Sequence, residues 1–99
     1  MNNKMLENAT INVSLGQSRY GTPEPQATLR FAKKTHYRIL RAALLSLAAE
    51  IEASTPMSES WTVQIDELSD DRGRVFLDLI QGGEPEVERG LALLRKVVG

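Results

Sequence analysis

The sequence predicts an α+β fold in which two helices cover one face of a three-stranded sheet, in the order βαββα. Two segments, residues 10–15 and 61–66, alternate apolar and polar side chains as half-buried strands do. Two others, residues 26–54 and 84–98, repeat apolar residues at helical spacing. A chain of 99 residues fits one domain, so these segments are expected to share a single core.

The N-terminal part divides into a tail and the first strand. Residues 1–9 contain no apolar period and are predicted to be a disordered tail before a single domain over residues 10–99. The first strand places its apolar side chains on one face: Ile11, Val13 and Leu15. Gly16 ends this alternation.

A long first helix is the most distinctive expected element. A connection rich in glycine, serine and proline leads into it, and Thr55-Pro56 ends it, because the residue before proline is disfavoured in the α region. Its apolar stripe consists of Leu29, Ala32, His36, Leu40, Ala43, Leu44, Leu47 and Ile51. Such a helix would be ~42 Å long, about twice the ~20 Å of a six-residue strand. The overhanging apolar surface favours a homodimer, and a kinked or shorter helix is the alternative.

The second half predicts a hairpin and a final helix. Residues 61–66 and 74–80 are the expected strands, joined by a polar turn over residues 69–73, with Trp61 anchoring the core. The final helix carries an apolar stripe of Val87, Leu91, Leu94 and Val98, and Gly90 within it indicates close packing against a neighbour. No internal repeat is visible in the sequence.

The composition argues against most kinds of catalysis. The chain has no cysteine, which removes thiolate chemistry and cysteine-based metal sites, and its one histidine, His36, lies on the predicted apolar stripe. The carboxylates around the hairpin turn, Asp66, Glu67, Asp70 and Asp71, lack the spacing of a calcium loop. We therefore expect no enzyme, no cofactor and no metal site. The lack of cysteine, the polar N-terminus and the short apolar runs favour a cytoplasmic protein with no membrane contact.

Charge is distributed unevenly along the chain. Residues 1–49 hold seven basic and two acidic residues, whereas residues 50–99 hold five basic and eleven acidic residues. The basic residues of the predicted first helix fall along one face: Arg30, Lys33, Lys34, Arg38 and Arg41. Cations at a helix N-terminus oppose the helix dipole, which suggests that they meet a partner.

Three partners fit this basic face: carboxylates of the same chain, an acidic protein surface, or nucleic-acid phosphate. The predicted function is a small intracellular non-enzymatic interaction protein (an adaptor, inhibitor or assembly factor) that binds a protein partner through the basic face of the first helix. The alternative is a nucleic-acid-binding regulator that uses the same face. The net charge of −1 and the few aromatic residues count against the alternative.

Overall fold

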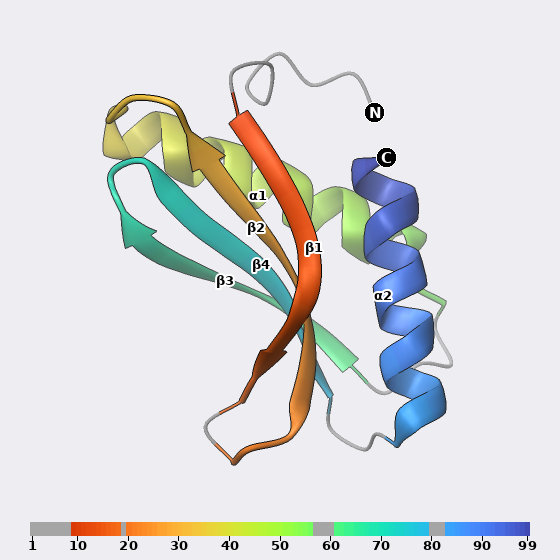
Figure 1. Cartoon of the computed structure of the whole chain (residues 1–99). Coiled ribbons are helices and arrows are strands. Elements are labelled where there is room, and N and C mark those ends of the chain that lie inside the picture. Colours follow the sequence, from red (N-terminus) through yellow and green to blue (C-terminus); the bar gives the residue numbers. More distant parts are fainter. Residues whose placement is uncertain (1–8, 19, 57–60, 80–82) are drawn as a thin grey trace.

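The computed structural model describes residues 9–18, 20–56, 61–79 and 83–99. Its elements are β1 (Ala9–Gln17), β2 (Pro23–Phe31), α1 (Tyr37–Ser54), β3 (Trp61–Ser69), β4 (Arg72–Leu79) and α2 (Glu84–Val98). The four strands form one antiparallel sheet in the order β1-β2-β4-β3 (Figure 1). The α+β class is as expected, but the predicted three-stranded sheet and the order βαββα are wrong.

Several local predictions agree with these elements. The predicted first strand lies within β1, the predicted hairpin is formed by β3 and β4, and the final helix has the predicted bounds. The predicted tail lies outside the described residues as far as residue 8, and Ala9 begins β1. In the described part of the chain, neither helix is long and apolar enough to cross a membrane.

The unpredicted strand is β2, which occupies the expected connection and the start of the expected helix. Its side chains alternate along the strand, and the buried ones are Pro25, Ala27, Leu29 and Phe31. A period of two therefore fits these residues, and pairing with β1 on one side and β4 on the other favours the strand. Pro25 is compatible with this central strand because the pairing with β4 spans only Gln26–Arg30.

The predicted long first helix is also wrong, because α1 begins at Tyr37 and has 18 residues. At 1.5 Å per residue it is ~27 Å long, which is close to the ~30 Å of a nine-residue strand. There is consequently no overhang to carry excess apolar surface. His36 is the N-cap residue of α1 and is exposed, so it does not belong to the core stripe.

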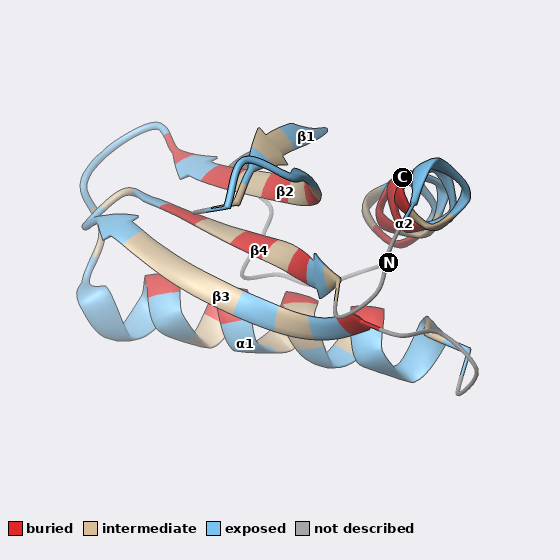
Figure 2. Ribbon diagram, turned by 90° about the horizontal axis from the view of Figure 1, so that it is seen from below, coloured by how far each residue is buried: buried red, intermediate tan, exposed pale blue. Residues whose placement is uncertain are grey.

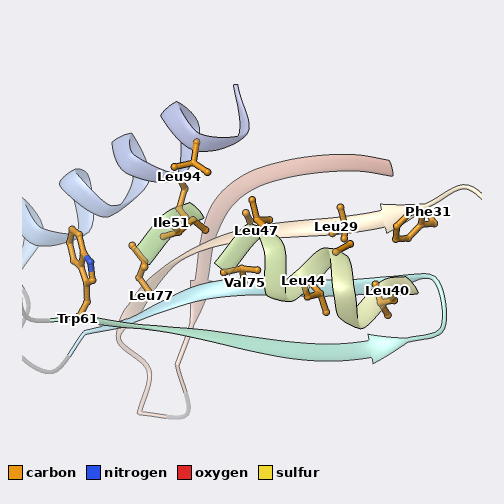
Figure 3. Packing of buried hydrophobic residues seen from close by; sticks show 13 residues of the cluster. Leu29, Phe31, Leu40, Leu44, Leu47, Ile51, Trp61, Val75, Leu77 and Leu94 are labelled. Atoms are coloured by element: carbon orange, nitrogen blue, oxygen red, sulfur yellow. The ribbon is translucent and has the colours of Figure 1, made fainter. Parts of the chain in front are cut away.

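Both helices pack against the same face of the sheet. α1 lies on β3 and β4, and α2 lies on β2 and β1. Figure 2 shows the buried side of α1 turned towards the strands. The core between helices and sheet is mainly aliphatic (Figure 3), with Leu47 and Ile51 of α1 meeting Leu94 of α2 and Leu77 of β4 in one cluster. Trp61 is 8% exposed and contributes to this cluster, as predicted.

The fold contains an internal repeat that was not visible in the sequence. Each half is a ββα unit, and the sheet order relates the two units by an approximate two-fold axis between β2 and β4. The helix of each unit packs on the hairpin of the other unit. The two helices also bury residues at the same spacing: Leu40, Ala43, Leu44 and Leu47 in α1, and Val87, Gly90, Leu91 and Leu94 in α2. The two units therefore share one core and depend on each other.

Candidate interaction surface

The sheet has one face that neither helix of the described chain covers. We call it the open face. Alternation along the strands places polar and charged side chains there, and none of them is buried. Its residues are Thr10, Asn12, Ser14, Glu24, Gln26, Thr28, Arg30, Thr62, Gln64, Asp66, Arg72, Arg74, Phe76 and Asp78.

Strand pairing arranges these side chains in four rows across the sheet. At one end Gly16 pairs with Glu24 and Thr62 pairs with Asp78, just beyond the residues over which β2 pairs with β4. The next two rows are Ser14, Gln26, Phe76 and Gln64, followed by Asn12, Thr28, Arg74 and Asp66. The row at the other end contains Thr10, Arg30, Arg72 and Ser69. The charges are thus separated, with two carboxylates in the first row and two guanidinium groups in the last.

The acidic end consists of Glu24 on β2 and Asp78 on β4, which border the same hollow and are close enough for the charge of Asp78 to act on Glu24. Partial burial and the negative charge of Asp78 raise the pKa of Glu24 above its ordinary value of 4.5, and the nearby Arg74 offsets part of this. A hollow of about 810 Å³ lies over this end, bordered by Tyr20, Gln64 and Phe76 as well as by the three charged residues. The acidic end therefore holds two carboxylates that repel each other beside a space open to a cation.

The centre of the open face is neutralised within the chain. Arg74 donates a hydrogen bond from Nη2 to Asp66 Oδ2 at 2.9 Å and another from Nη1 to Gln26 Oε1 at 3.4 Å. Its guanidinium carbon lies 5.4 Å from the centre of the Phe76 ring, within the range of a cation–π contact. Arg74 is held by three neighbours and separates the two charged ends.

The basic end consists of Arg30 and Arg72, which are exposed and directly opposite each other on β2 and β4. Two cations in this position are destabilising unless an anion is nearby. Asp71, in the adjoining turn, supplies a nearby negative charge. A hydrogen bond from Ser69 is the main cause that lowers the pKa of Asp71, and the two arginines lower it further. A hollow of about 210 Å³ is lined by these four residues.

The residues predicted as a basic helix face lie on three different elements. Arg30 lies on β2, Lys33 and Lys34 lie in the connection after β2, and Arg38 and Arg41 lie in the first turns of α1. The connection is tied to the β3–β4 turn by hydrogen bonds from the Phe31 amide to the Asp71 carbonyl (2.7 Å) and from the Thr35 amide to the Asp70 carbonyl (3.3 Å). Four of the five cations therefore border the same end of the molecule, although no single helix presents them.

Arg41 differs from the others because its charge is matched within the chain. Its guanidinium forms an ion pair with Glu67 on β3, and the Tyr37 hydroxyl donates a second hydrogen bond to the same carboxylate at 2.8 Å. These contacts, with the one from Tyr37 the stronger, lower the pKa of Glu67. Arg41 thus fastens the first turns of α1 to the sheet.

No pattern in the sequence was interpreted as joining Glu24, Arg72, Arg74 and Asp78 in a common surface. The signal for two of them was present, because Arg74 and Asp78 occur at even spacing along the predicted strand over residues 74–80 and must share a face, whereas Arg72 was assigned to the turn before it. Glu24 was missed because β2 was assigned to a helix. The acidic turn forms no metal site in the described residues, where no three metal-ligating side chains lie close together.

Comparisons with protein-family models, curated proteins and solved structures found no match to this chain.

The pKa values of two carboxylates give a prediction about pH. Because the pKa of Glu24 is raised in the folded state, its unfavourable contribution grows as pH rises above 4.5. The pKa of Glu67 is lowered, so its favourable contribution is present above 4.5 and is lost as pH falls through the folded-state pKa. At pH 7 we expect Glu24→Gln to raise the urea midpoint and Glu67→Gln to lower it.

At pH 4 the difference in urea midpoint between each variant and the wild type should be smaller than at pH 7. The comparison uses urea unfolding at low protein concentration, so that only the monomer is measured. A change of the same sign for both variants at pH 7 would contradict the assignment of opposite electrostatic roles to these carboxylates.

Proposed function

We propose that the chain is a small intracellular non-enzymatic interaction protein that binds a protein partner through the open face. The observation that carries this proposal is the uncovered sheet face with its charges separated into an acidic end and a basic end. Interspersed charges would suit a face that only has to be soluble, whereas separated charges produce an oriented field that favours one partner and one orientation. The lack of cysteine supports the intracellular location.

The proposal keeps the predicted adaptor, inhibitor or assembly role but changes the surface. Of the predicted contact residues, Arg30 lies on the open face, Lys33 and Lys34 lie in the connection that follows β2, and Arg38 lies on α1, which covers the other face of the sheet. Arg41 is neutralised by Glu67 and is assigned a structural role.

Two charge-reversal variants test which surface binds. Arg30→Glu with Arg72→Glu removes the basic end of the open face, and Lys33→Glu with Arg38→Glu makes the same change in net charge beside it. If the open face binds a protein, the first variant should capture at least about tenfold less partner from native lysate than the wild type, because like charges would now oppose each other. The second variant should capture nearly the wild-type amount, and equal losses in both would refute the open face as the contact surface.

Nucleic-acid binding is the second candidate, favoured by the gathering of cations at one end of the molecule: Arg30, Lys33, Lys34, Arg38 and Arg72. The acidic end of the same sheet opposes phosphate. Among the described residues of the open face Phe76 is the only aromatic ring, and one ring already in contact with Arg74 does not make a platform for stacking successive bases. This candidate requires that Lys33→Glu with Arg38→Glu weaken a salt-sensitive gel shift, and no shift at low salt would exclude it.

A further inference from the structure

Resting on the proposed function, we propose that the protein partner of the open face is a second copy of this chain. The two copies pack face to face, related by a two-fold axis that lies in the interface and runs across the strands.

The internal repeat relates the acidic end of the open face to its basic end. The approximate axis of the repeat passes near the paired residues Ala27 and Val75. Glu24 is three residues before Ala27, and Arg72 is three residues before Val75, so the repeat relates an acid to a base. Arg30 and Asp78, each three residues after the same pair, are related in the same way. The repeat thus relates ends of opposite charge, and the ladder between β2 and β4 reaches only the basic one.

Only one two-fold arrangement matches these charges. If the axis ran along the strands, the acidic end of one copy would lie on the acidic end of the other, and the basic ends would also meet. An axis across the strands instead places each acidic end on a basic end. Glu24 then faces Arg30 of the second copy on the same strand, and Asp78 faces Arg72 of the second copy. Each ion pair occurs twice because the interface is isologous.

The two central rows also match in this arrangement. Phe76 faces Arg74 of the second copy, which preserves a cation–π contact, and Gln64 faces Asp66 of the second copy. Gln26 faces Thr28 of the second copy, and Ser14 faces Asn12 of the second copy. Among the described rows no two like charges are opposed. The hollow over the acidic end gives an arginine side chain from the second copy room to reach both carboxylates.

The size of the open face sets the strength expected of the dimer. Four strands ~4.8 Å apart and four rows ~6.8 Å apart cover roughly 500 Å² per copy. A total of roughly 1,000 Å² belongs to the weak, transient class of interfaces. Dimerisation should therefore depend on protein concentration in the micromolar range, and it should weaken as salt screens the ion pairs.

Charge exchange between the ends tests the arrangement. Arg30→Glu with Arg72→Glu gives an acidic variant, with both ends negative, and Glu24→Arg with Asp78→Arg gives a basic variant, with both ends positive. In sedimentation equilibrium the wild-type mass should rise from 11.0 kDa towards twice that value with increasing concentration. Each variant alone should remain near the monomer mass, an equimolar mixture should regain the dimer, and a chain with all four substitutions should dimerise alone.

Circular dichroism checks that each variant is folded. The neutral variant Arg30→Gln with Arg72→Gln is expected to weaken the dimer, and it replaces any charge-reversal variant that unfolds. Lys33→Glu with Arg38→Glu is the control and should dimerise as the wild type does. A wild type that stays monomeric, single-sign variants that still dimerise, or a mixture that fails to pair would each overturn the inference. If the wild type is monomeric yet captures another protein through the open face, the proposed function stands and only the second copy is wrong.

Discussion

Replacing Leu47 with alanine should lower the free energy of unfolding by about 2–5 kcal/mol, the usual range for a buried leucine. Leu47 is fully buried in the middle of α1 and belongs to the cluster that joins both helices to the sheet. Removing its side chain leaves a cavity that the neighbouring elements fill only in part. A chain of this size has a total stability of about 5–15 kcal/mol, so a large fraction of it would be lost.

The matched control is Leu45→Ala, the same change two residues earlier on the same helix. Leu45 is 49% exposed, and we expect a loss of less than about 1 kcal/mol. Urea unfolding measures both variants, and the midpoint of Leu47→Ala should fall much further. Similar midpoints for the two variants would show that α1 does not turn this side towards the sheet.

The sequence correctly predicts those elements whose residue pattern fits only one type of secondary structure. β1 and β3 alternate strictly, and the final helix has acids in its first turn and cations in its last turn, which agree with the helix dipole. β2 was missed because Leu29 and Ala32 extend the helical spacing of α1 by chance. Local pattern could not resolve this ambiguity, because β2 is stabilised by pairing with β1 and β4, and the spacing of apolar residues within one segment does not reveal which strands pair with it.

The error in β2 also moved the candidate surface. Four of the five predicted cations do gather at one end of the molecule, but strand pairing and a turn bring them together, not helical spacing. The acidic end was out of reach of the sequence, because Glu24 and Asp78 are far apart in the chain and become neighbours only through the sheet. The ion pair between Arg41 and Glu67 similarly joins residues that no local pattern connects.

Gly73→Val should destabilise the protein by about 1–3 kcal/mol, although valine is favoured in strands and glycine is not. A Cβ atom at Gly73 would lie 2.6 Å from Leu44 Cδ1 and 3.2 Å from the Asp66 carbonyl oxygen. Leu44 is fully buried, so its side chain has little space to move away. A second close approach of a helix to the sheet occurs at Gly90 of α2, where a Cβ atom would lie 2.9 Å from Pro25 and 3.0 Å from Leu77.

Shortening the opposing side chain should separate this clash from a general intolerance of valine. Leu44→Ala alone leaves a cavity and should cost about 2–5 kcal/mol. In the double variant the added valine methyls occupy part of that cavity, so its loss should be smaller than the sum of the two single losses by about 1 kcal/mol or more. Urea unfolding of the four proteins gives this coupling directly. Additive losses would mean that Gly73 and Leu44 do not touch, and the packing of α1 on β4 would then have to be revised.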